Sequence, residues 1–159
     1  MYALPIIALV SLLAVVPAGD EPVPPRVLIF SKTAGFRHDA IASGLAAVRE
    51  LATDGGFAVD ATEDAALFTP ENLARYRAVV FLNSSGEVFD DKQKAAFQGF
   101  IRGGGGLAAV HQGVTTLDKW PWYVTLVGGV KFAGHPEPQQ ATVHCEIRDH
   151  AATKELPET

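Results

Sequence analysis

Short apolar runs alternate with amphipathic segments along most of the chain. Four runs are rich in β-branched and aromatic residues and have the length of buried strands: residues 26–31, 57–62, 77–83 and 107–111. The first segment between them has apolar residues at the spacing of one helix face: Ile41, Leu45, Val48 and Leu51. Thr69 followed by Pro70 marks another helix start. This alternation predicts an α/β fold whose parallel sheet is covered by helices on both faces.

The alternation of strand and helix signals ends after residue 118. An aromatic-rich stretch follows, and residues 139–148 then alternate apolar and polar positions. That period predicts an exposed or edge strand. No helical pattern follows it up to Thr159.

The first residues of the chain differ from the rest. Fourteen residues from Ala3 to Val16 carry no charge. This run is shorter than the roughly 20 apolar residues of a membrane span, but it suits the core of a secretory signal peptide. We expect a signal peptide at 1–18, a linker at 19–25, a domain at 26–159, and a secreted or periplasmic location. No Lys or Arg precedes the run, so a buried N-terminal element or a wrongly assigned start codon is the alternative.

Composition narrows the function classes. The 159 residues carry 13 basic and 18 acidic side chains, a formal net charge of -5, which gives no basic surface for nucleic acid. We expect neither a nucleic-acid partner nor a stable membrane span, and the oligomeric state stays open. The single Cys excludes a disulfide within the chain and a structural CxxC zinc site.

Polar and aromatic residues gather directly after the predicted strands. In open α/β sheets, ligands bind beyond the carboxyl ends of the strands, so these residues should converge there. They are Lys32, Arg37, His38, Asn83, His111, Asp118, Trp120, Trp122, Tyr123 and His135. The stretch 84–86, Ser-Ser-Gly, follows a strand and is a weak candidate for an anion cradle.

Three of these residues are candidates for proton transfer: His38, His111 and Asp118. Together with His135, the histidines would also allow a divalent metal such as zinc, although no HExxH or HxH motif is present. Each residue also has a purely structural alternative. His111 could be a hydrogen-bonded core residue, His38 could belong to a helix cap, and the tryptophans could fill the core.

Several motifs occur in a characteristic order. They are KTAGFRH at 32–38, FLNSSG at 81–86, GGGGLAAVH at 103–111, WPWY at 120–123 and HP at 135–136. In these motifs the chain resembles the ThuA-like (trehalose utilisation) family, which is similar in fold to class I glutamine amidotransferases. The resemblance implies a flavodoxin-like three-layer sandwich with a parallel sheet. Gln112-Gly113 stand where family members usually have small residues. The family's usual C-terminal segment is absent, so the resemblance implies a domain that is incomplete at its C-terminus.

The resemblance implies work on a small-molecule sugar, in disaccharide or keto-sugar utilisation. His111, His38 and Asp118 would then carry the acid/base chemistry. The residues expected to bind substrate are Lys32, Arg37, Asn83, Trp120, Trp122, Tyr123 and His135. A covalent route is not expected, because the elbow after the fourth strand has no Cys or Ser nucleophile and Cys145 lies elsewhere. A non-catalytic carbohydrate-binding module and an inactive fragment of a larger ThuA-domain protein are the alternatives.

Overall fold

The computed structural model describes residues 23–137 and 139–158. The predicted signal peptide at 1–18 and residues 19–22 of the linker lie outside the described residues. The strands are β1 (Arg26–Phe30), β2 (Ala58–Thr62), β3 (Ala78–Leu82) and β4 (Gly106–Val110). The helices are α1 (Ala40–Gly55), α2 (Pro70–Leu73), α3 (Asp91–Arg102) and α4 (Pro121–Leu126), with short 3-10 helices η1 (Ala65–Leu67) and η2 (His111–Thr115). All four predicted strands are confirmed to within one residue at each end.

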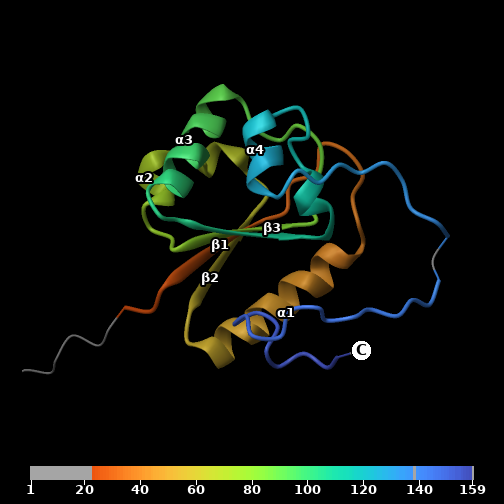
Figure 1. The fold of residues 1–159 in the computed structure, drawn as a ribbon. Helices are drawn as coiled ribbons and strands as arrows, with labels where there is room; N and C mark the ends of the chain where they lie inside the picture. The colour runs from red at the N-terminus through yellow and green to blue at the C-terminus, as the bar shows by residue number, and fades with distance from the viewer. Residues whose placement is uncertain (1–22, 138, 159) are drawn as a thin grey trace, which may run out of the picture.

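The four strands form one parallel sheet in the order β2-β1-β3-β4. Helix α1 covers one face, and α2, α3 and α4 cover the other (Figure 1). The predicted flavodoxin-like α/β fold is therefore confirmed. The strand order reverses between β1 and β3, and such a switch point opens a crevice at the carboxyl ends of the strands.

The main core lies between the sheet and helices α2 to α4. Its centre is a cluster of phenylalanine rings: Phe30, Phe68, Phe81, Phe89 and Phe97. Phe68 lies 4.7 Å from Phe30 and 4.3 Å from Phe89 between ring centroids, which is the contact range of packed aromatic rings. Because Phe30 ends β1 and Phe81 lies in β3, this packing fixes the two strands that border the crevice.

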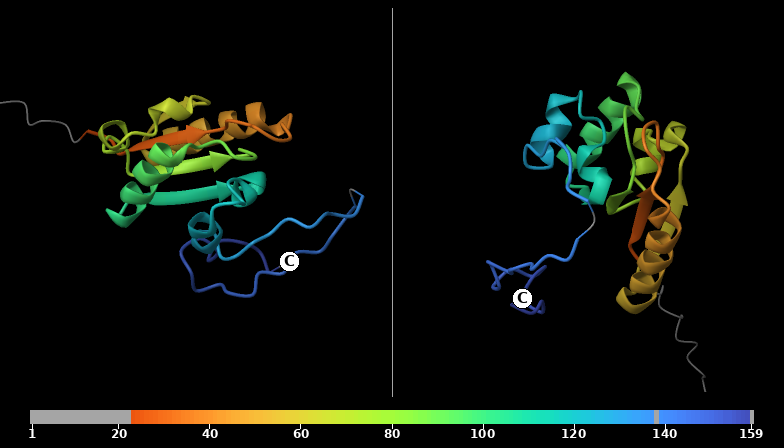
Figure 2. Two further views of the ribbon diagram at one scale, coloured as in Figure 1. Left: turned by 90° about the horizontal axis from the view of Figure 1, so that it is seen from above. Right: turned by 90° about the vertical axis from the view of Figure 1, so that its right-hand side faces the viewer.

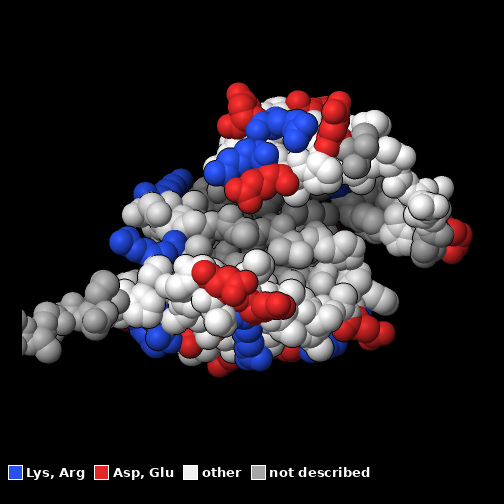
Figure 3. All heavy atoms as spheres, turned by 90° about the horizontal axis from the view of Figure 1, so that it is seen from below, with Lys and Arg blue, Asp and Glu red and all other residues white. Residues whose placement is uncertain are grey.

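The opposite face of the sheet is covered less completely. Ile41 of α1 is buried, but Leu51 is 62% exposed, so the predicted apolar stripe is buried only in part. Gly44 brings α1 close to the sheet, because a Cβ there would lie 2.9 Å from Leu82 Cδ1. Figure 3 shows the molecule from below, with charged side chains in an upper and a lower group and a band of mostly uncharged residues between them.

The strand predicted at 139–148 is wrong. Residues 139–148 have no regular secondary structure, and the alternating side chains of Val143 and Ile147 are both exposed. Instead the segment folds back on itself, since Cys145 N–H donates to Glu158 O at 3.0 Å. An alternating pattern becomes a strand only when a neighbouring strand pairs with it, and in Figure 2 this segment runs outside the sheet.

Candidate functional site

A cavity of about 560 Å³ opens beside the carboxyl end of β4. It brings together three residues singled out from the sequence, His38, His111 and His135. The full lining is Phe36, His38, His111, Gln112, Val114, Thr115, Val130, Lys131, Phe132, Ala133, Gly134 and His135. Residues 130–135, called the strap below, form one wall, and the turn after β4 forms another.

His111 occupies a strand-to-helix elbow. It follows the last residue of β4 directly, begins η2, and has a φ of 52°, which a non-glycine residue rarely adopts. Its side chain is exposed to the cavity, so it is not the core histidine of the structural alternative. Its Nδ1 lies 2.8 Å from Asn83 Oδ1. An amide oxygen only accepts hydrogen bonds, so Nδ1 carries the hydrogen and the Nε2 lone pair of neutral His111 stays free.

The elbow depends on the residues packed beneath it. A Cβ on Gly113 would lie 2.3 Å from Phe81 O, so only glycine lets η2 lie against the end of β3. The hydroxyl of Tyr123 donates to Gly113 O at 2.7 Å, and burial raises the pKa of Tyr123, which keeps this donor protonated. Thr116 Oγ1 donates to Ser84 O and ties the end of η2 to the loop after β3.

His38 lies edge-on to His111, with ring centroids 4.6 Å apart and ring planes at 88°. Phe36 packs on its other side, 4.8 Å away. Asp39 is the N-cap of α1 but makes no side-chain capping bond, and His38 contributes only its carbonyl, which accepts from Ile41 N–H. The helix-cap alternative therefore does not account for the His38 side chain, whose Nδ1 is buried without a hydrogen-bond partner.

His135 reaches the cavity from the strap. Its Nδ1 donates to Pro136 O at 2.8 Å, and its ring lies 5.9 Å from that of Phe132. The zinc ligand set that the histidines would provide is not assembled. Within residues 23–137 and 139–158, no three His, Cys, Asp or Glu side chains are placed to hold one metal ion.

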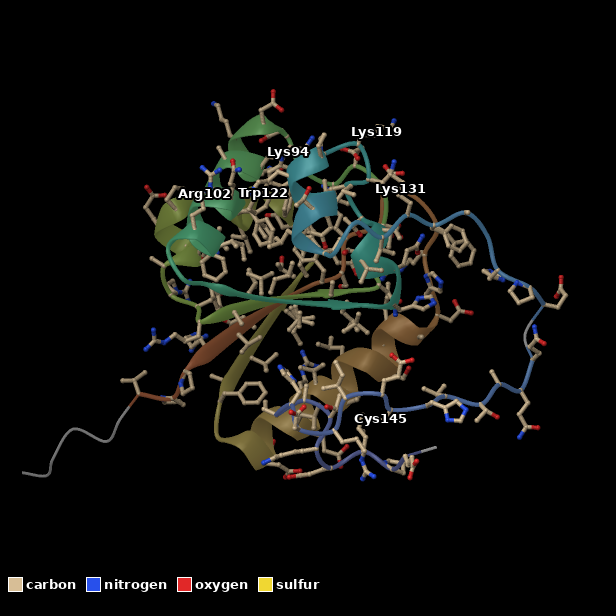
Figure 4. The ribbon with its side chains drawn as sticks, viewed as in Figure 1. Lys94, Arg102, Lys119, Trp122, Lys131 and Cys145 are labelled. Atoms are coloured by element: carbon tan, nitrogen blue, oxygen red, sulfur yellow. The ribbon has the colours of Figure 1, made fainter. Side chains whose placement is uncertain are left out.

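The three predicted aromatic binding residues lie elsewhere. Tyr123 is fully buried and stacks on Phe81, with ring centroids 5.5 Å apart. Trp122 meets Phe97 of α3 edge-on at 6.1 Å, and Trp120 lies 4.8 Å from Trp122 (Figure 4). Helix α4 begins at Pro121 and turns these rings onto the core. None of the three rings lines the cavity: Tyr123 belongs to the core, and the half-buried Trp120 and Trp122 pack against it.

Three charged residues predicted for the site do not line the cavity. Asp118 is exposed beyond it. Arg37 donates to both carboxylate oxygens of Glu63, at 3.0 and 2.8 Å, and these hydrogen bonds raise the pKa of Arg37. Lys32 is half-buried and its carbonyl accepts from Ser85 N–H. Asn83 serves the site indirectly, through its hydrogen bond to His111.

The Ser-Ser-Gly stretch is a structural joint rather than an anion cradle. Ser84 and Ser85 are both buried. Ser85 Oγ donates to Phe36 O at 2.7 Å and accepts from Gly35 N–H at 3.3 Å. These bonds join the loop after β1 to the loop after β3, and they leave the Ser85 hydroxyl engaged within the protein.

Sequence reasoning missed four notable residues of the cavity wall: Phe36, Gln112, Lys131 and Phe132. Phe36 is 68% and Phe132 is 65% exposed, although both are large apolar rings. Phe36 lies inside the KTAGFRH motif, which could have drawn attention to it. Lys131 (Figure 4) and Phe132 belong to the strap, whose sequence has no helical or strand period to indicate its position.

The fold and the cavity define an open α/β protein with a ligand-sized pocket at the carboxyl edge of its sheet. The model of the ThuA family, described as trehalose utilisation, matches residues 26–159. The chain therefore belongs to the ThuA family.

A solved structure shares the fold. A ThuA-like protein from Bacteroides uniformis ATCC 8492 superposes with a TM-score of 0.72 at 24% sequence identity. The match covers 90% of this chain and 60% of that one, so this chain spans about 60% of that protein's length. The search of curated proteins found no match. Among the described residues, no helix combines the length and apolar character needed to cross a bilayer.

Proposed function

We propose that this chain acts on a carbohydrate and moves a proton on a carbon next to a carbonyl group, as in a keto-sugar or an oxidised disaccharide. Its membership of a family described as trehalose utilisation supports the substrate class. The observation that carries the proposed chemistry is the hydrogen bond from His111 Nδ1 to Asn83 Oδ1. It leaves the other ring nitrogen of His111 free as a base at the mouth of a cavity.

In the proposed step, His111 Nε2 takes the proton from the carbon next to the carbonyl. The electron pair of the broken C–H bond forms a C=C bond, and the carbonyl electrons move to oxygen. Asn83 Oδ1 faces the Nδ1–H of the resulting imidazolium and holds the ring in place. In this proposal His38, whose ring lies 4.6 Å from that of His111, donates an N–H to the developing oxyanion. Where the deprotonated carbon carries a hydroxyl, that hydroxyl passes its proton to the oxyanion. Return of the first proton from His111 to the former carbonyl carbon then gives the isomerised sugar.

The walls of the cavity support a sugar ligand. Phe36 and Phe132 offer exposed apolar faces on which the C–H face of a sugar ring can lie. They take over the role that the sequence assigned to Trp120, Trp122 and Tyr123. The described lining residues include no Asp or Glu, and Lys131 is their only Lys or Arg. A neutral ligand suits such a wall.

A non-catalytic carbohydrate-binding module is the second candidate. The two exposed phenylalanines favour it, since a binding module needs aromatic faces and no base. If the chain is a binding module, ligand binding should survive the loss of His111, and no proton of the ligand should exchange with solvent. Because the chain spans about 60% of its structural neighbour, an inactive fragment of a larger ThuA-domain protein is a further alternative.

Solvent exchange in D₂O separates the candidates without knowledge of the final product. Keto-sugars and oxidised disaccharides are incubated with the protein, and NMR measures deuterium entering the position next to the carbonyl. We expect His111→Ala to slow this exchange by about 10²–10⁴-fold with ligand affinity kept. His144→Ala is the matched control, because His144 is exposed on the C-terminal segment and does not line the cavity. Binding without exchange would favour the binding module, and neither binding nor exchange would contradict both.

A further inference from the structure

The cavity wall contains a buried acceptor without a donor. Among the described residues, Gln112 Oε1 is one of three buried side-chain polar atoms with no hydrogen-bond partner. His38 Nδ1 is another, and both residues line the same cavity. Buried polar atoms in native proteins are nearly always paired, so an orphan at a cavity wall points to a partner that arrives with a ligand. An amide oxygen accepts only, so this partner must bring a donor.

Three side-chain donors close to Gln112 in the sequence or in the site are engaged with other acceptors. His111 directs its Nδ1 to Asn83. Thr115 Oγ1 donates to the backbone carbonyl of Gln112 at 3.1 Å, and Thr116 Oγ1 donates to Ser84 O. The Gln112 side chain itself has no described hydrogen bond, so it does not hold η2 in place through one.

The chemistry of the lining selects the kind of donor. A cationic ligand would be expected to meet a carboxylate, but the described lining includes no Asp or Glu. A multiply charged anion would be expected to meet several basic side chains, but Lys131 is the only Lys or Arg there. Neutral hydroxyl groups remain the donors that fit an amide oxygen beside three imidazoles and two exposed phenyl rings.

We propose that Gln112 is a specificity-determining residue of this cavity, whose buried Oε1 accepts a hydrogen bond from one hydroxyl group of a neutral, polyhydroxylated ligand. The proposal rests on the proposed carbohydrate function for its ligand class. It does not depend on the proton-transfer chemistry. The acceptor follows the proposed base directly in the sequence, so it selects ligands at the reacting end of the cavity.

The test is a cycle between protein variants and ligand variants. The probes are methyl α-glucopyranoside and its 2-, 3-, 4- and 6-deoxy analogues, titrated by NMR. Three proteins are compared: the unaltered protein, Gln112→Met and Gln140→Met. Gln112→Met keeps the length of the side chain without its polar atoms. Gln140 is exposed and lies outside the cavity lining, so Gln140→Met controls for the substitution itself.

We expect the unaltered protein to bind one deoxy analogue about tenfold more weakly than the parent glucoside, because that analogue leaves Gln112 Oε1 unpaired. In Gln112→Met this preference should fall below about twofold, whereas Gln140→Met should keep it. An unchanged preference in Gln112→Met, or no binding of any of the five probes, would overturn the proposal. If proton exchange is seen in D₂O but Gln112→Met has the same ligand preference as the unaltered protein, the proposed function stands and this subsite does not. If Gln112→Met loses the preference but no proton exchange is seen, the subsite stands and the proposed proton transfer does not.

Discussion

At the scale of single residues, the candidate site contains backbone conformations that residues other than glycine rarely adopt. Asn83 and His111 have φ values of 50° and 52°, and they directly follow the neighbouring strands β3 and β4. Such conformations persist only where the surroundings hold them, and they gather at functional sites. Asn tolerates this region better than most residues. The hydrogen bond between the two side chains thus joins two strained strand ends, which fixes the direction of the His111 ring.

Removal of the Asn83 amide tests this positioning role. Asn83→Ala should release His111 Nδ1, so that both neutral tautomers of the ring become populated. We expect ligand affinity to stay within about twofold while proton exchange slows by about tenfold or more. The ¹⁵N chemical shifts of His111 give a readout that a merely structural role would not move. Unaltered tautomer shifts in Asn83→Ala would contradict the assignment.

Tyr123 lies beneath the elbow, and removal of its hydroxyl tests how far it stabilises the fold. Its hydroxyl donates to Gly113 O in a fully buried setting, so Tyr123→Phe leaves a buried carbonyl without its partner. We expect a loss of about 1–3 kcal/mol in the free energy of unfolding, measured by urea denaturation. Tyr76→Phe is the comparison, because the Tyr76 hydroxyl bonds to the partly exposed Asp60, which water can solvate instead. An equal loss in the two variants would count against the special role of Tyr123.

At the scale of elements, the close approach of η2 to β3 determines where His111 lies. A Cβ on Gly113 would meet the Phe81 carbonyl at 2.3 Å, and a backbone atom cannot move aside as a side chain can. We expect Gly113→Ala to destabilise the fold by about 1–3 kcal/mol and to weaken ligand binding, followed by thermal denaturation and by NMR titration. Gly99→Ala is the control, because a Cβ on Gly99 in α3 would meet no atom within 4 Å, and it should stabilise by up to about 1 kcal/mol. A harmless Gly113→Ala would mean that η2 packs differently.

The edge strand β2 and its neighbour β1 are joined by a pH-dependent contact between side chains. A hydrogen bond from Arg26 lowers the pKa of Asp60, and a second one from Tyr76 lowers it further. Partial burial of Asp60 acts in the opposite direction, but the pKa stays below its ordinary value. A depressed pKa in the folded state contributes stability above the unfolded pKa of about 3.9, and this stability is lost as pH falls through the folded pKa. Both charged side chains are about one-third exposed, so the contribution is small. Urea denaturation from pH 7 to pH 2.5 should show a shallower acid loss in Asp60→Asn than in the unaltered protein; parallel curves would contradict this.

The elements that sequence reasoning found and missed differ in a physical way. The two central strands, β1 and β3, were predictable because a parallel strand covered on both faces is mostly apolar. The edge strands β2 and β4 are only partly buried, and β2 carries Asp60. The aromatic stretch after residue 118 was assigned to the cavity because composition does not say toward which side a ring turns. Only the packing of α4 on α3 decides that Trp122 and Tyr123 belong to the core. The strap was missed because residues 130–135 have no period, although they supply half of the cavity lining.

At the scale of the whole molecule, the cavity lies between the carboxyl end of the sheet and the strap, which has no regular secondary structure. The rigid side is the pair of strand ends that carry Asn83 and His111, supported by the phenylalanine cluster. The opposite side is the strap, preceded by Gly128 and Gly129 with φ of 87° and 76°. The proposed base, His111, thus belongs to the side of the strand ends, and Phe132, one of the two exposed rings, belongs to the strap. The ligand would contact both sides at once.

The location of the protein is the remaining proposal at this scale. We propose that residues 1–18 direct export and are then removed, because the uncharged run from Ala3 to Val16 ends in Val16-Pro17-Ala18, with small residues before the expected cleavage. In an exporting host, the mature protein should begin at Gly19 and appear outside the cytoplasm, as read by N-terminal sequencing and intact mass. Leu12→Arg, which places a charge inside the apolar run, should keep the protein in the cytoplasm at full length. An intact Met1 on cytoplasmic protein without that substitution would contradict export.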